Sequence, residues 1–173
     1  MLFAILFFIY LLFQPILASA FYDPLSVPNN RYGIHIADTA DIEDASKLVN
    51  STGGEWGYIT LVIPDTDMNV GKWQEIFNRL RRNKLIPLVR IATHVEGDSW
   101  VKPQEHNIPK WVNFLNSLPW PIENRYVILF NEPNHAKEWG NTIDPEGYAS
   151  LLVKFSNALK TSSEDYFILP AGL

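Results

Sequence analysis

The sequence contains no cysteine, and this absence removes several kinds of chemistry at once. A chain without thiols forms no disulfide, has no cysteine nucleophile and offers no thiolate ligand to a metal. It also lacks any run of lysines and arginines, and its net charge is -5, so we do not expect it to bind nucleic acid. With 173 residues, 47% of them hydrophobic, the chain is large enough for one domain with a sizeable core.

Several short signatures are missing as well. No Gly-x-Gly-x-x-Gly follows the first apolar segment and no Walker A sequence occurs, which argues against a nucleotide-binding doubly wound fold. No His-Glu-x-x-His or comparable spacing is present, so we interpret His94, Glu96 and Asp98 as residues of a solvated loop. We therefore expect neither a metal nor another cofactor.

The first twenty residues differ in character from the rest. Met1 to Phe13 is almost purely apolar, and Ala18-x-Ala20 has the small-residue form of a signal-peptidase site. The apolar run is shorter than the roughly 20 residues that span a membrane. However, no Lys or Arg precedes Arg31, so the usual basic start of a signal peptide is absent. We predict that residues 1–20 are a signal peptide of a secreted, extracellular protein. An N-terminal membrane anchor is the alternative, and only in that case do we expect membrane contact.

Strand-like and helix-like segments alternate along the remaining chain. The predicted strands are residues 33–36, 56–63, 85–92, 125–130 and 167–169. Helical patterns begin near Asp41, Val70, Ile108 and Asp144. Strands joined by helical crossovers are parallel, and strands that are apolar throughout are buried on both faces. The predicted fold class is therefore α/β.

Within that class we predict a (β/α)8 TIM barrel, truncated here after about five strands. A complete barrel takes about 250 residues, so residues 21–173 would form its N-terminal part. A fifth strand with no helix after it would leave an open sheet edge in a complete domain. A five-stranded open sheet is the alternative.

The fourth predicted strand runs directly into Asn131-Glu132-Pro133. In a parallel barrel, catalytic groups stand at the carboxyl ends of strands. We expect Glu132 to be buried there beside apolar residues such as Phe130, where desolvation raises the pKa of a carboxyl group. A carboxylic acid that stays protonated near neutral pH can act as a general acid, and Asn131 can hydrogen-bond a substrate hydroxyl beside it.

This stretch carries a resemblance to a known group of enzymes. A strand followed by Asn131-Glu132-Pro133-Asn134, then Glu138-Trp139-Gly140, then Asp144-Pro145-x-x-Tyr148-Ala149, resembles glycoside hydrolase clan A, in particular the cellulase-like and xylosidase-like members of families 5 and 39. The resemblance implies that Glu132 is the acid/base of a retaining mechanism and that Asn131 binds the 2-hydroxyl of the sugar that is cleaved. Such a mechanism needs a second carboxylate roughly 5 Å away. In the clan this nucleophile comes from the seventh strand, which this sequence lacks, so we expect the chain as given to be inactive.

Other polar and aromatic residues are predicted to lie at the same end of the sheet. The candidates for substrate binding are His35, Arg90, His94, His135 and Trp139. Arg90 either holds a catalytic carboxylate or a substrate hydroxyl, or pairs with an acid inside the barrel. Trp139, and with it Trp100, lies in a loop that would line the cleft, and we expect Trp139 to stack on a sugar ring.

The predicted function is that of an O-glycosyl hydrolase acting on an oligo- or polysaccharide. One alternative is a barrel that binds glycan without cleaving it. The other is an unrelated secreted α/β binding protein, which strands in an open, doubly wound order would support.

Overall fold

The computed structural model describes residues 28–52 and 56–172. The predicted leader, residues 1–20, and its cleavage site lie outside the described residues. No helix in the described part of the chain is long and apolar enough to cross a membrane.

Five parallel strands form the central sheet, and they lie side by side in the order in which they occur in the sequence. They are β1 (Gly33–His35), β2 (Gly57–Pro64), β3 (Leu85–Ala92), β6 (Arg125–Leu129) and β7 (Tyr166–Pro170). This confirms the predicted α/β class, and the sequential order is the one that the predicted barrel requires. In a doubly wound sheet the order would reverse beside the first strand, whereas here β1 stands at the edge and pairs with β2 alone.

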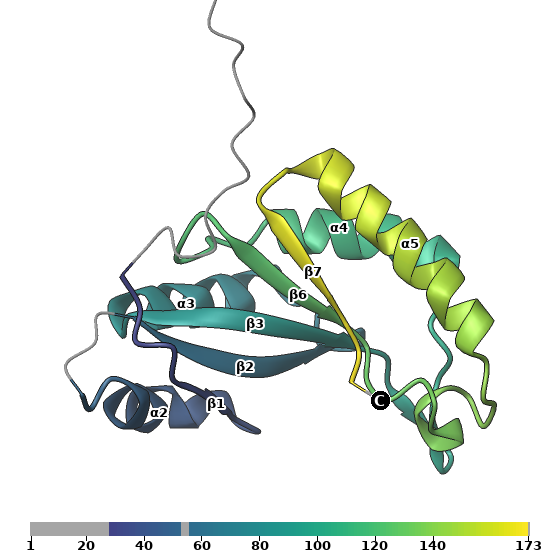
Figure 1. Cartoon of the computed structure of the whole chain (residues 1–173), viewed down its shortest axis with the longest axis horizontal. Helices are drawn as coiled ribbons and strands as arrows, with labels where there is room; N and C mark the ends of the chain where they lie inside the picture. Colours follow the sequence, from purple (N-terminus) through teal and green to yellow (C-terminus); the bar gives the residue numbers. More distant parts are fainter. Residues whose placement is uncertain (1–27, 53–55, 173) are drawn as a thin grey trace, which may run out of the picture.

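Four helices lie outside the curve of this sheet, as Figure 1 shows. They are α2 (Ile42–Val49), α3 (Val70–Arg82), α4 (Ile108–Asn116) and α5 (Pro145–Ser162). Two of them begin with a side-chain cap, in which Asn69 accepts a hydrogen bond from the backbone of Lys72 and Asp144 accepts one from the backbone of Gly147. The helices bury one face of every long strand, which forms the hydrophobic core.

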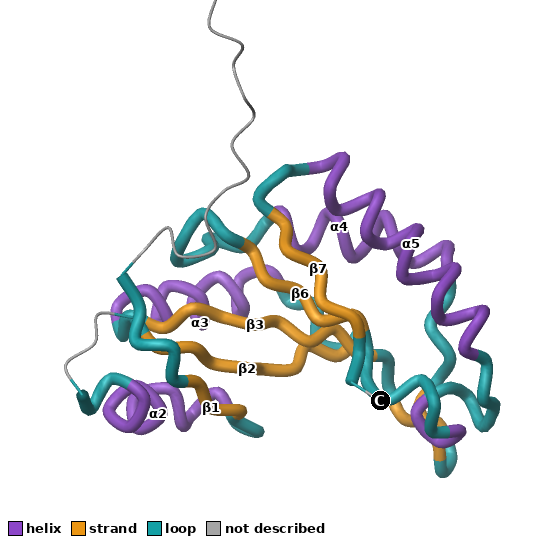
Figure 2. Tube along the Cα trace, in the orientation of Figure 1, coloured by secondary structure: helices purple, strands orange, loops and turns teal. Residues whose placement is uncertain are grey.

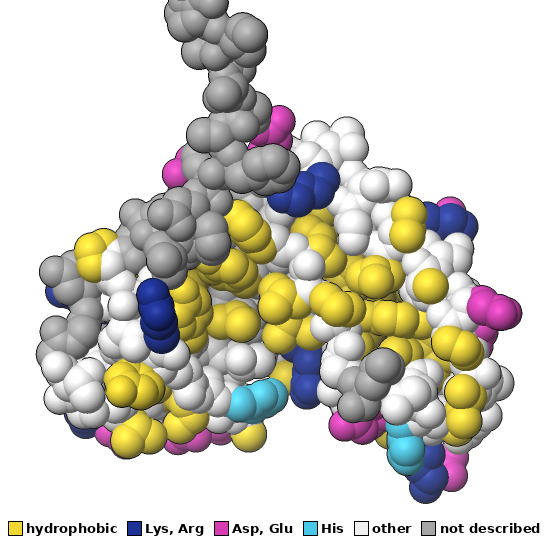
Figure 3. Space-filling view, in the orientation of Figure 1, with side chains coloured by type: hydrophobic (Ala, Val, Ile, Leu, Met, Phe, Trp, Pro, Cys, Tyr) yellow, Lys and Arg dark blue, Asp and Glu magenta, His cyan; other side chains and the backbone are white. Residues whose placement is uncertain are grey.

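The alternation along β2 shows how the two faces of the sheet differ. Ile59, Leu61 and Ile63 are buried beneath the helices, while Thr60 and Val62 between them are half-buried on the concave face. Val62 is in register with Arg90 of β3, so the only charged residue within that strand also lies on the concave face. Hydrophobic side chains gather over the middle of the molecule in Figure 3, where this face is seen.

The connections that follow β3 and β6 contain short elements that the sequence analysis treated as loops. A hairpin of β4 (Val95–Glu96) and β5 (Ser99–Trp100) follows β3, and the 3-10 helix η3 (Ala136–Glu138) follows β6. Figure 2 shows these short elements away from the centre of the sheet. The backbone N–H of Gly140 donates to the carbonyl of Trp100 at 2.9 Å, which ties the two connections together. Gly140 has φ +64, and a Cβ there would lie 2.9 Å from the Cβ of Lys102, so the close approach requires glycine.

Candidate active site

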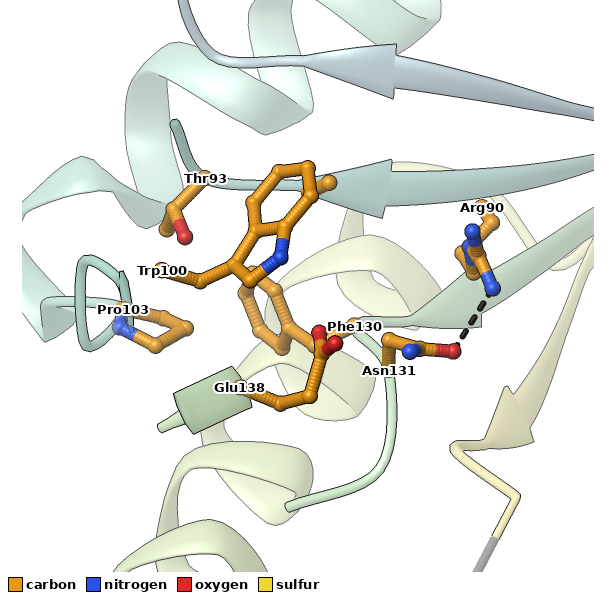
Figure 4. A pocket seen from close by; sticks show the side chains of 8 residues that line it. Arg90, Thr93, Trp100, Pro103, Phe130, Asn131 and Glu138 are labelled. Atoms are coloured by element: carbon orange, nitrogen blue, oxygen red, sulfur yellow. Dashed lines mark hydrogen bonds between the residues drawn. The ribbon is translucent and has the colours of Figure 1, made fainter. Parts of the chain in front are cut away.

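Two polar side chains meet where β3 and β6 approach their carboxyl ends. Arg90 Nη1 donates a hydrogen bond of 2.6 Å to Asn131 Oδ1. Because a guanidinium only donates, this contact fixes the Asn131 amide with its oxygen toward Arg90. The amide nitrogen, a donor, then faces the other way, into the pocket drawn in Figure 4. Among the described residues, Arg90 therefore pairs with an amide and with neither a catalytic carboxylate nor an acid inside the barrel. The third role considered from the sequence, binding of a substrate hydroxyl, stays a prediction.

A cavity of about 150 Å³ opens beside this pair. Its lining comes from β3, the β4–β5 hairpin, the end of β6 and η3, and consists of Arg90, Ala92, Thr93, Trp100, Pro103, Phe130, Asn131 and Glu138. In Figure 4 the carboxylate of Glu138 points between the indole of Trp100 and the amide of Asn131. Of the predicted site residues, only Arg90 and Asn131 line this cavity.

Glu132 stands at the predicted edge of the sheet, but the predicted burial of its carboxyl group is wrong: Glu132 is exposed. The cause is the backbone at the end of β6. Phe130 has φ 69, in the left-handed region, and turns the chain out of the strand. The Phe130 ring is thereby directed into the core, while Glu132 enters a turn closed by the backbone of His135, whose N–H donates to the Glu132 carbonyl at 2.8 Å.

The prediction that Trp139 stacks on a sugar is also wrong, because none of its side chain is exposed. Its indole packs edge-to-face against Phe130 and Tyr148, with ring centroids 6.0 and 5.6 Å apart. A ring enclosed on both faces by its own protein is a core residue. The half-buried tryptophan of the pocket is Trp100. The turn sequence Gly97-Asp98, two residues before Trp100, was the available signal for a hairpin that would carry Trp100 there.

His94 is held by a residue that the sequence analysis missed. Its Nδ1 lies 3.0 and 3.2 Å from the two carboxylate oxygens of Asp65. Asp65 directly follows β2 and His94 follows β3 by one residue, so two neighbouring strand ends bring them together. A carboxylate at Nδ1 fixes the ring orientation and leaves Nε2 for another partner. The position of Asp65 directly after an apolar strand could have identified it.

None of the three predicted histidines lines the pocket, and His35 and His135 lie on the surface. His35 ends β1 and His135 follows Glu132, and both are exposed. His35, Arg90 and Glu132 do lie toward the same edge of the sheet, as predicted, because the parallel strands all end there. The described residues include no group of three or more His, Asp or Glu placed to hold a metal ion.

Behind the site, Tyr148 of α5 connects two strand ends. Its hydroxyl accepts from the backbone N–H of Ala171 at 2.6 Å and lies 3.3 Å from the carbonyl of Leu129, to which it donates. Burial raises the pKa of the Tyr148 hydroxyl, so it stays a neutral donor at physiological pH. The hydrogen bond to Leu129 holds the end of β6, two residues before Asn131.

Comparison with solved structures places this fold among barrel glycosidases. The chain is similar to a monomeric beta-xylosidase from Caulobacter crescentus, with a TM-score of 0.58 and 14% identity over 82% of this chain and 36% of that one. It is similar to a GH39 enzyme from Xanthomonas axonopodis pv. citri, with a TM-score of 0.53 and 15% identity over 80% and 34%. It is also similar to a beta-mannanase from Streptomyces thermolilacinus, with a TM-score of 0.51 and 18% identity over 81% and 47%.

These similarities define the fold as part of a (β/α) barrel and confirm the predicted barrel architecture for the described residues. They agree, at the level of the fold, with the resemblance to clan A. The chain spans less than half the length of each of these three structures. No protein-family model and no curated protein matches the sequence.

Proposed function

We propose that this chain belongs to a retaining O-glycosyl hydrolase in which Glu132 is the acid/base. One observation carries the proposal: Arg90 orients Asn131 with its amide donor toward a pocket, directly before Glu132 at the end of a barrel strand. An amide fixed in this way can donate to a hydroxyl of the sugar that is cleaved. The barrel fold, shared with a xylosidase and a mannanase, supports the same chemistry.

The mechanism divides the work between two neighbouring residues. Asn131 binds a sugar hydroxyl and thereby sets the position of the scissile bond beside Glu132. Glu132 donates a proton to the glycosidic oxygen as the bond breaks and later removes a proton from water. A second carboxyl group, roughly 5 Å from the first, must form and release the glycosyl ester. The proposal assigns this nucleophile to none of the described residues, so the chain as given should not turn over substrate.

The test uses the complete product of the gene and the variant Glu132→Ala. Substrates with poor leaving groups need the proton most, and their hydrolysis should fall by about 10²–10⁴-fold. Activated aryl glycosides should still form the glycosyl ester, which then reacts slowly with water. Added azide should restore their turnover and yield a glycosyl azide of retained configuration.

The matched control is Glu146→Ala, which removes an exposed carboxylate from the first turn of α5. It should hydrolyse every substrate at the wild-type rate. If Glu132→Ala slows all substrates alike and azide has no effect, the assignment of Glu132 is wrong.

A barrel that binds glycan without cleaving it is the second candidate. The exposure of Glu132 favours it, since the enclosed apolar surroundings predicted for a general acid are absent around Glu132 among the described residues. The same assay separates the two candidates. Binding of an oligosaccharide with no hydrolysis by the complete gene product would establish the second.

A further inference from the structure

Glu138 is half-buried at the pocket, and its carboxylate has no partner in the described part of the chain. No ion pair or side-chain hydrogen bond of Glu138 occurs among residues 28–52 and 56–172. Two lysines of the neighbouring segments are engaged elsewhere: Lys137, which directly precedes Glu138, with Asp98 at 3.9 Å, and Lys102 with Asp144 at 2.6 Å. An ionised carboxylate only accepts hydrogen bonds, so what is missing at Glu138 is a donor.

The groups around Glu138 supply the rest of a recognition site for a sugar. Trp100 presents an indole on one side, and the donor nitrogen of the Asn131 amide lies on the other (Figure 4). Apolar C–H faces of a sugar ring pack on an aromatic ring, and its hydroxyls pair with polar groups at the rim. Vicinal hydroxyls match the two oxygens of one carboxylate.

The cavity also limits the size of the ligand. Its volume of about 150 Å³ lies below the about 300 Å³ at which pockets begin to enclose a drug-sized molecule. A cavity of this size suits one sugar ring rather than several.

We propose that this pocket binds one neutral sugar ring, with Trp100 as its platform and Glu138 as the acceptor that selects neutral sugars against uronic acids. The inference rests on the proposed function and adds the substrate class. A sugar carboxylate placed here would face Glu138, and the repulsion between like charges would oppose binding. Arg90, the cation of the pocket, lies beside Asn131, and its Nη1 donates to the amide oxygen of that residue.

The experiment measures binding of xylotriose, mannotriose and trigalacturonate to the full chain by titration calorimetry. Wild-type protein should bind at least one neutral trisaccharide and bind trigalacturonate at least ~10-fold more weakly. Glu138→Gln, which is nearly isosteric, should weaken neutral binding by about 10-fold, since a charge-assisted hydrogen bond is lost, and should reduce the discrimination against trigalacturonate. Trp100→Ala should weaken binding of the neutral sugar by about 10-fold, while Trp100→Phe should retain most of the affinity.

Glu146→Gln is the matched control, and it should bind like the wild type. Preference of the wild type for trigalacturonate, or unchanged affinity in both Glu138→Gln and Trp100→Ala, would overturn the inference. These results would leave the proposed function standing if Glu132→Ala still shows azide rescue. If no sugar binds and azide rescue is also absent, both the neutral-sugar inference and the proposed function are wrong.

Discussion

Arg90 and Asn131 are joined by a hydrogen bond of 2.6 Å that crosses from β3 to the end of β6. The contact determines which end of the Asn131 amide faces the pocket, so Arg90 acts on a ligand through Asn131. Among the described residues, the buried guanidinium Nε has no hydrogen-bond partner, and an unpaired buried donor costs stability.

We expect Arg90→Met to free the amide and to lower kcat/KM of the complete gene product by about 10–100-fold through loss of a fixed donor. A substrate without its 2-hydroxyl separates this effect from a general loss of stability. The wild type should lose activity on the 2-deoxy glycoside, whereas Arg90→Met should show little further loss. Equal losses in both proteins would mean that Arg90 does not act through Asn131.

The two tryptophans near the site should behave in opposite ways. Trp139 is completely buried, so Trp139→Ala should destabilise the fold by about 3–5 kcal/mol, as measured by denaturant unfolding. Trp100 is half-buried at the pocket, and Trp100→Ala should cost far less stability while it weakens sugar binding. A folded Trp139→Ala protein of wild-type stability would contradict the packing described for this ring.

The stability of the contact between Asp144 and Lys102 should depend on pH. The Lys102 ammonium, and after it the backbone N–H of Gly147, lower the pKa of the Asp144 carboxyl group. Because the pKa of Asp144 is lowered in the folded state, its charge stabilises the folded protein at pH values above the ordinary pKa of an aspartate. This stabilisation is lost as the pH falls through the pKa of the folded state. Asp144→Asn keeps a capping side chain but loses the charge.

The melting temperature of Asp144→Asn should therefore lie below that of the wild type at pH 7, and the difference should be smaller at about pH 2. Asp98→Asn serves as a control, because Asp98 is exposed and lies 3.9 Å from its lysine. Its melting temperature should match the wild type at both pH values. A difference for Asp144→Asn that persists undiminished in acid would show that the charge is not the cause.

Export can be tested directly at the N-terminus. If Ala18-x-Ala20 is cleaved by signal peptidase, N-terminal sequencing of the exported protein should begin at Phe21. Replacement of Ala20 by a bulky residue, as in Ala20→Leu, should block processing. An intact Met1 found in the membrane fraction of wild-type cells would establish an anchor instead.

The sequence by itself determined the strands, the helices and their order. Apolar segments alternating with helical patterns leave few arrangements, because a helical crossover forces neighbouring strands to be parallel. The same logic placed Arg90, Asn131 and Glu132 at one edge of the sheet, where the structure has them. These are consequences of local pattern and connectivity, which a single sequence carries.

The environment of each side chain was decided only by the tertiary structure. The left-handed Phe130 sends its own ring into the core and leaves Glu132 exposed, and no propensity of Phe predicts that turn. Trp139 and Trp100 both lie in predicted loops, yet packing against Phe130 buries the first, while the β4–β5 hairpin carries the second to the pocket. The burial of a side chain depends on residues that are distant in the sequence and belong to other elements. A sequence can therefore indicate where a site lies without showing which of its residues face a ligand.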